Sequence, residues 1–103
     1  METQFNEHIG SWIKLHNEAE SNKKIETVVY IKIKIAVEDK RNWTIEGNGF
    51  TINPKTEEFV NYEKTYFRTV IPKTVVNWEF ISENDVRNIY QIAELKRKTK
   101  IFE

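Results

Sequence analysis

A short passage that occurs twice constrains the fold of this chain more than any other feature. Residues 51–56 (TINPKT) are followed by 60–63 (VNYE), and residues 69–74 (TVIPKT) are followed by 76–79 (VNWE). Each copy places one of the chain's two prolines between apolar, β-prone runs, and a proline-initiated turn commonly joins antiparallel strands. The passage therefore predicts hairpins. Whether it is a true duplication stays open, because turn residues recur for local reasons.

The first segment carries the pattern of an amphipathic helix. One face of a 3.6-residue period holds Phe5, Ile9, Trp12, Ile13, His16 and Ala19. Charged and polar side chains fall opposite, which is typical of a helix packed on a core. Thr3 is a suitable N-cap, so we expect a helix over residues 3–21.

From Ile25 to Val37 the period changes to two. One face of this run carries Ile25, Val29, Ile31, Ile33, Ile35 and Val37, and lysines and glutamates dominate the other. This alternation predicts a half-buried strand of about 13 residues, longer than most strands. A strand of this length is expected to bend and favours a barrel-like sheet.

Two further hairpins are predicted. Asn48-Gly49 suits a type I′ turn, which needs positive φ at both central positions; the alternative is a continuous strand with a glycine bulge. A second turn at Pro72-Lys73 would pair Phe67 with Trp78 and bury Val76 on the same face.

The last segment is expected to form a second helix over residues 83–98, with Ser82 as its N-cap and Asp85 three residues later. Its apolar stripe consists of Val86, Ile89, Tyr90 and Ala93. The alternative is a single 3₁₀ turn followed by a strand over residues 86–92, which is the order of elements in Sm-like small barrels that follow an N-terminal helix.

These elements predict an α+β fold in one domain, residues 1–103: an N-terminal amphipathic helix packed on a curled antiparallel sheet of four or five strands, partly closed as a barrel, with a short C-terminal helix. The chain has no cysteine, an acidic first segment and no apolar run of about 18 residues, so we expect a soluble, cytoplasmic protein. Its lysine, isoleucine and asparagine bias suggests a bacterial or phage origin.

Catalytic chemistry is not indicated by any motif. The chain lacks a glycine-rich phosphate loop and a nucleophile elbow, and no spacing selects a pair of carboxylates. His8 and His16 are too far apart on the expected helix to share a metal, and His16 with Glu20 would need a third ligand. We therefore expect neither an enzyme nor a cofactor or metal site.

Aromatic and basic residues occur together on the expected strands and are the candidate binding residues: Tyr30, Lys32, Lys34, Tyr66 and Arg68. Open sheets that hold single-stranded nucleic acids combine stacking aromatics with phosphate-binding cations. The ordinary alternative is that these residues are the solvated faces of strands, with lysines protecting an edge from aggregation.

The hypothesis that follows is a small non-enzymatic module that binds a protein partner, as a regulator or inhibitor from a bacterial mobile element or phage. Thirteen aromatic residues support it, because tryptophan and tyrosine contribute much of the energy of protein interfaces. The alternative is an RNA or single-stranded DNA binding protein, which the balance of 16 basic and 16 acidic residues does not favour. Self-association through a sheet edge is a further expectation, and a membrane partner is not expected.

Overall fold

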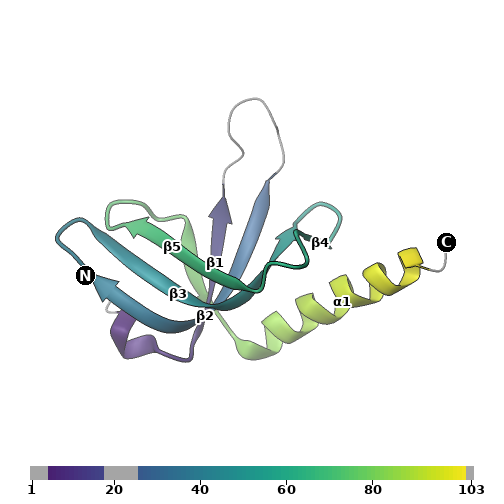
Figure 1. Cartoon of the computed structure of the whole chain (residues 1–103), viewed down its shortest axis with the longest axis horizontal. Helices are drawn as coiled ribbons and strands as arrows, with labels where there is room; N and C mark the ends of the chain where they lie inside the picture. The colour runs from purple at the N-terminus through teal and green to yellow at the C-terminus, as the bar shows by residue number, and fades with distance from the viewer. Residues whose placement is uncertain (1–4, 18–25, 102–103) are drawn as a thin grey trace.

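The computed structural model describes residues 5–17 and 26–101 (Figure 1). These residues form mostly antiparallel sheet with a helix at the C-terminal end. The elements are a 3₁₀ helix, η1 (Phe5–His8), the strands β1 (Trp12–Asn17), β2 (Thr27–Glu38), β3 (Asn42–Asn53), β4 (Glu58–Val60), β5 (Tyr66–Pro72) and β6 (Trp78–Ile81), and the helix α1 (Glu83–Ile101).

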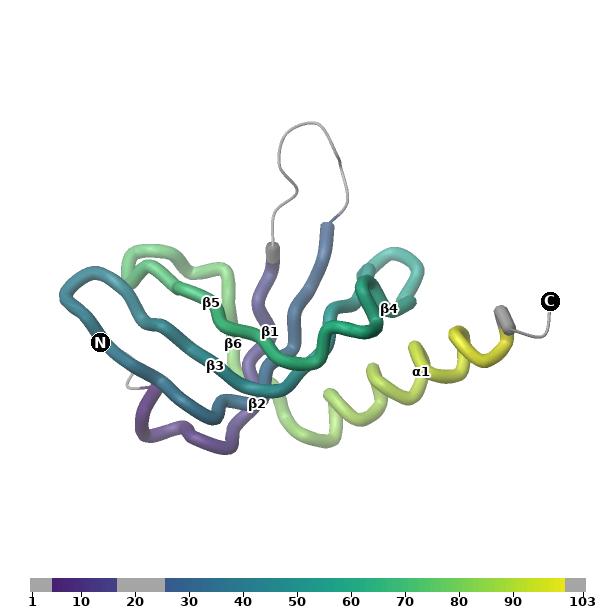
Figure 2. Tube along the Cα trace, viewed as in Figure 1, coloured from purple at the N-terminus to yellow at the C-terminus, as the bar shows by residue number. Residues whose placement is uncertain are grey.

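The sheet is organised around β3, which pairs with β2 along one side. On its other side the start of β3, Asn42–Asn48, pairs with β5, and its end, Thr51–Asn53, pairs with β4. The strand order is β4-β3-β2-β1-β6, with β5 added on β3. The described residues form a six-stranded sheet that is not closed, so the predicted partly closed barrel of four or five strands is wrong. Figure 2 shows how the long strands bend and the sheet curls.

The predicted N-terminal helix is wrong. Residues Phe5–His8 form only one 3₁₀ turn, and Trp12–Asn17 form β1, while the remaining residues of the prediction lie outside the described ranges. Ile13 and Leu15 alternate with Trp12 and Lys14 in the period of a strand, and both are buried. The same positions also fit a helical stripe, but a helix there would leave the edge of β2 and the backbone of β6 without the strand that pairs with both.

The long strand is confirmed, but an irregularity within it changes the face of the sheet on which its later side chains lie. β2 pairs with β3 in register up to Ile33 and shifts at Lys34, so that Ile35 is the next paired residue. An extra residue in one strand of an antiparallel pair is a β-bulge, and it bends the strand. Beyond the bulge Ile35 and Val37 lie on the opposite face from Ile33.

The predicted Asn48-Gly49 hairpin is wrong. Of its alternative, a continuous strand with a glycine bulge, the continuous strand is confirmed and the glycine bulge is wrong. The hairpin turn lies before β3, where Asp39 Oδ1 accepts hydrogen bonds from the backbone N–H of Arg41 and Asn42, each at 2.7 Å. The register shift belongs to β2 and not to the glycines. Gly49 is required for another reason: a Cβ there would lie 1.9 Å from the carbonyl oxygen of Tyr30 on β2.

One of the two Pro-Lys-Thr turns joins paired strands as predicted. The turn after Asn53 connects β3 to β4, which pair antiparallel. The turn at Pro72 instead leads β6 away from β5 to the far edge of the sheet, where it pairs with β1. The predicted pairing of Phe67 with Trp78 is therefore wrong, and Val76 is 89% exposed.

The helix at the C-terminal end is confirmed and is longer than predicted. Ser82 Oγ accepts a hydrogen bond from the backbone N–H of Asp85 at 3.1 Å, as an N-cap does. The alternative strand over residues 86–92 is wrong, because these residues are helical. No helix within residues 5–17 and 26–101 is long and apolar enough to cross a membrane.

Two apolar layers lie on the two faces of the sheet. The inner layer, on the concave side, contains Phe5, Ile13, Leu15, Val29, Ile31, Ile33, Trp43, Ile45, Phe67 and Ile71. The outer layer lies between the sheet and α1 and contains Val28, Tyr30, Phe50, Ile52, Val86 and Ala93. The helix therefore covers part of the outer face and, as Figure 1 shows, extends beyond the sheet near β4.

Candidate protein-binding surface

The outer face continues past α1 as an exposed surface on β2, β3 and β5. We call this surface the open face. Pairing across the three strands arranges it in three rows, which are Val37–Thr44–Val70, Ile35–Glu46–Arg68 and Lys32–Asn48–Tyr66. Directly opposed residues of antiparallel strands share a face, with Cβ atoms about 5 Å apart. The nine side chains are therefore neighbours on one surface.

Large apolar side chains of the open face are exposed to solvent. The exposed fractions are 41% for Ile35, 57% for Val37, 43% for Tyr66 and 56% for Val70. Scattered exposed apolar residues are ordinary in proteins, but a contiguous group is typical of an interaction site. This group spans all three rows: Ile35 and Val37 lie on β2, Tyr66 and Val70 lie on β5, and the polar side chains of β3 lie between the two pairs.

Charged groups stand among these apolar side chains. Glu46 lies directly opposite Arg68 in the strand register, and its Oε1 accepts a hydrogen bond from the Tyr66 hydroxyl at 3.2 Å. Partial burial raises the pKa of Tyr66, and the charge of Glu46 and this hydrogen bond raise it further. Glu46 and Tyr66 are therefore hydrogen-bonded to each other on the open face.

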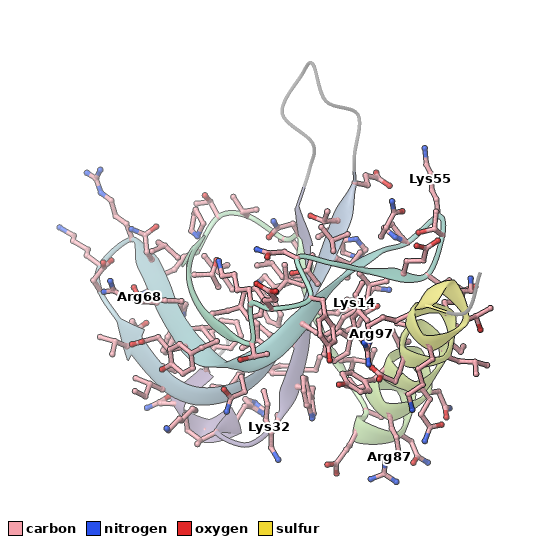
Figure 3. The ribbon with its side chains drawn as sticks, turned by 45° about the vertical axis from the view of Figure 1, so that its right-hand side comes forward. Lys14, Lys32, Lys55, Arg68, Arg87 and Arg97 are labelled. Carbon is pink, nitrogen blue, oxygen red and sulfur yellow. The ribbon has the colours of Figure 1, made fainter. Side chains whose placement is uncertain are left out.

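Two cations of the open face form no ion pair within the described part of the chain. Lys32 and Arg68 form no ion pair with any residue in the ranges 5–17 and 26–101. Both side chains project outward from the sheet in Figure 3. They are therefore available to a partner.

The predicted binding residues are partly brought together. Lys32, Tyr66 and Arg68 lie on the open face, and Lys34 is exposed at the bulge of β2. Tyr30 is only 5% exposed and stacks on Phe50, with ring centroids 5.1 Å apart. Burial raises the pKa of Tyr30, and the charge of Glu79 adds to this. Tyr30 therefore belongs to the layer under α1 and not to the surface.

The apolar members of the site were missed from the sequence, and the bulge explains why. Uninterrupted alternation along β2 assigns Ile35 and Val37 to the buried face together with Ile33. The register shift at Lys34 moves them to the outer face, where α1 does not cover them. The run of Ile35, Ala36 and Val37 was a weak signal, because three successive apolar residues must place at least one on each face.

A groove separates the open face from α1. Its volume is about 420 Å³, and Asn48 belongs both to the groove and to the open face. The groove is lined by Trp12, Asn48, Gly49, Phe50, Thr65, Glu83, Val86, Arg87 and Tyr90. Its apolar floor extends the apolar character of the open face up to the helix.

The basic end of α1 stabilises the fold locally. Lys96 Nζ donates a hydrogen bond to the Thr56 carbonyl at 2.6 Å and lies 3.5 Å from Glu57. The guanidinium of Arg97 pairs with Glu94 and lies 4.5 Å from the centre of the Tyr62 ring. The Arg97 hydrogen bond lowers the pKa of Glu94. These contacts attach α1 to the β3–β4 turn and the loop after β4.

Metal-binding groups are dispersed in the described ranges. His16 lies on β1 and not on a helix, and Glu20 lies outside the described residues. Between residues 5 and 17 and between 26 and 101, no three histidine, aspartate or glutamate side chains gather in a metal-binding cluster.

No protein-family model, no curated protein and no solved structure matches this chain. We therefore infer its function from the residues of the open face.

Proposed function

We propose that this protein is a non-enzymatic binding module that holds a protein partner on its open face. The observation that carries this proposal is the joint exposure of Ile35, Val37, Tyr66 and Val70 on β2 and β5, the strands that flank β3. Burying such side chains against a partner contributes about 25 cal/mol for each Å² of apolar surface removed from water. Their exposure in the isolated chain forgoes this free energy, which a partner recovers.

The chemistry of the open face favours a protein over a nucleic acid. Interface centres are enriched in aromatic residues and arginine, and Tyr66 and Arg68 supply both. A single-stranded nucleic acid would require stacking rings and cations without opposing charge. The open face offers one exposed ring, and Glu46 lies between its cations and would repel phosphate.

A single-stranded RNA or DNA remains the second candidate, because Lys32 shares the row of Tyr66 and Arg68 lies two residues along β5. Phosphate contacts would make its affinity fall steeply as salt increases. A protein held by apolar contacts would bind with weak salt dependence.

When bound to a protein, the module would act as a regulator or inhibitor by occupying its partner's surface.

The proposal is tested by capture of a partner from a lysate of the source organism. The open-face variant carries Val37→Lys and Val70→Lys, and the matched control carries Val75→Lys and Val76→Lys. Val75 and Val76 are also exposed but lie on the connection between β5 and β6. We expect the wild type and the control to retain the same protein, identified by mass spectrometry after nuclease treatment.

The open-face variant should lose this protein while keeping the circular dichroism spectrum and melting temperature of the wild type. Equal retention by both variants would exclude the open face as the site. Retention that nuclease treatment abolishes would favour the nucleic-acid alternative.

A further inference from the structure

We infer that the partner held on the open face is a second copy of this chain, arranged about a two-fold axis. This inference rests on the proposed function, because it names the occupant of the same surface. A two-fold interface places one surface patch against itself, so the patch must complement its own charges and shape. The open face meets the charge condition through Glu46 and Arg68.

Glu46 and Arg68 are opposite charges at the same level of neighbouring strands, β3 and β5. A two-fold axis that runs along the strands midway between β3 and β5 places Glu46 of one copy over Arg68 of the other. The symmetric contact places Arg68 of the first copy over Glu46 of the second. Both charges of the central row are then paired across the interface, twice in each dimer.

Other simple axes do not satisfy these charges. An axis along β3 would stack Glu46 on the same residue of the other copy, and an axis across the strands through the central row would also stack Arg68 on itself. Like charges placed opposite each other are destabilising. Charge complementarity therefore selects the axis between β3 and β5. There Val70 meets Thr44 and Tyr66 meets Asn48, while Ile35 and Val37 border the contact.

The charge of the whole chain also permits self-association. Its 16 basic and 16 acidic residues give a formal net charge of zero, so two copies do not repel each other over long distances. A different protein partner would need no such internal balance of charge on the open face.

The test is sedimentation velocity of the full chain over a wide micromolar range, with three proteins: the wild type, Arg68→Glu and Glu46→Arg. We expect the wild type to dimerise with increasing concentration. Each single variant puts like charges in both symmetric contacts and should raise the dimer dissociation constant about tenfold or more. Circular dichroism and thermal melting check that each variant is folded.

The decisive sample is an equimolar mixture of the two single variants. In a mixed dimer, both contacts again join opposite charges, so the mixture should dimerise within about threefold of the wild-type dissociation constant. Opposite charges that acted only within each chain would give no such rescue.

A wild type that stays monomeric at every concentration would overturn the inference, as would single variants that dimerise normally or a mixture that is not rescued. A monomeric wild type that still captures a protein through the open face would leave the proposed function standing. If the chain neither dimerises nor captures a protein through the open face, the inference and the proposed function are both wrong.

Discussion

The outer face of the sheet has two halves that are built alike and used differently. In the covered half, Phe50 and Tyr30 lie in one cross-strand row and are buried under α1. In the open half, Ile35 on β2 and Val70 on β5 lie on the two sides of β3 and are exposed. Both halves are built on β2 and β3 and carry large apolar side chains, but α1 covers one half, whereas the other includes β5 and the charged residues Glu46 and Arg68.

This difference separates the residues that stabilise the fold from the residues that we propose bind a partner. Apolar residues under α1 contribute to the stability of the chain itself, because the helix removes them from water. Apolar residues of the open half contribute little to that stability and are available to a second molecule. Variants in the two halves should therefore change different properties, stability in one and association in the other.

The largest effect is expected at Gly49, which lies at the boundary between the halves. The Cβ of Gly49→Ala would meet the Tyr30 carbonyl oxygen at 1.9 Å, so β2 and β3 would have to separate. We expect a loss of at least about 3 kcal/mol of unfolding free energy, measured by urea denaturation. Asn48→Ala, the neighbouring exposed position, is the control and should change it by less than about 0.5 kcal/mol. Equal stability of both variants would contradict the close approach of the strands.

The next effect compares the two halves directly. Phe50→Ala removes a buried ring from the layer under α1 and should cost about 3–5 kcal/mol. Val70→Ala removes exposed atoms and should change the unfolding free energy by no more than about 0.5 kcal/mol. Urea denaturation of the dilute chain measures both. A Val70 variant as unstable as the Phe50 variant would show that the open half is part of the core.

A smaller loss of stability is expected from weakening α1, the helix that covers the outer layer. Ser82→Ala removes the N-cap bond to Asp85 and should cost about 1 kcal/mol, whereas Ser82→Asp should retain most of it. Helical circular dichroism during thermal melting reports the change. Loss of stability by both variants would show that the side chain acts through some other contact.

The smallest effect concerns the pKa values of two tyrosines, one in each half. Glu46→Gln removes the charge that raises the pKa of Tyr66 and should lower that pKa, while Tyr30 under α1 is unaffected. A folded-state pKa raised above the unfolded value of about 10 gives stability that is present below that pH and is lost as pH rises past it. Glu46→Gln should therefore weaken the decline of stability in alkaline solution.

NMR titration of the tyrosine ring signals separates Tyr66 from Tyr30. A shift of the Tyr30 pKa in the Glu46 variant would contradict the separation of the halves. An unchanged Tyr66 pKa would show that burial alone sets it.

Local sequence signals predicted the elements whose stabilising contacts are near in the chain. The length of β2 followed from alternation, the start of α1 from Ser82, and the β3–β4 turn from Pro54. The N-terminal helix failed because the spacing of Phe5, Ile9 and Ile13 fits a helix, while the pairing that makes β1 a strand comes from residues distant in sequence.

The candidate site was only partly predictable for the same reason. Lys32, Tyr66 and Arg68 followed from their chemistry, but their common face depends on pairing β3 with β5 rather than β5 with β6. Ile35 and Val37 depend on a one-residue bulge, and the burial of Tyr30 depends on where α1 lies. These are tertiary outcomes that no local pattern encodes.

The most direct test of this account is amide hydrogen exchange of the full chain, free and bound to the protein that it retains. If that protein is a second copy, dilute and concentrated samples are compared. We predict that binding slows exchange in residues 66–70, which lie in the contact for either partner, and leaves residues 28–30 and 50–52, under α1, unchanged. Slower exchange confined to other segments, or no change on binding, would contradict the assignment of the open face as the binding surface.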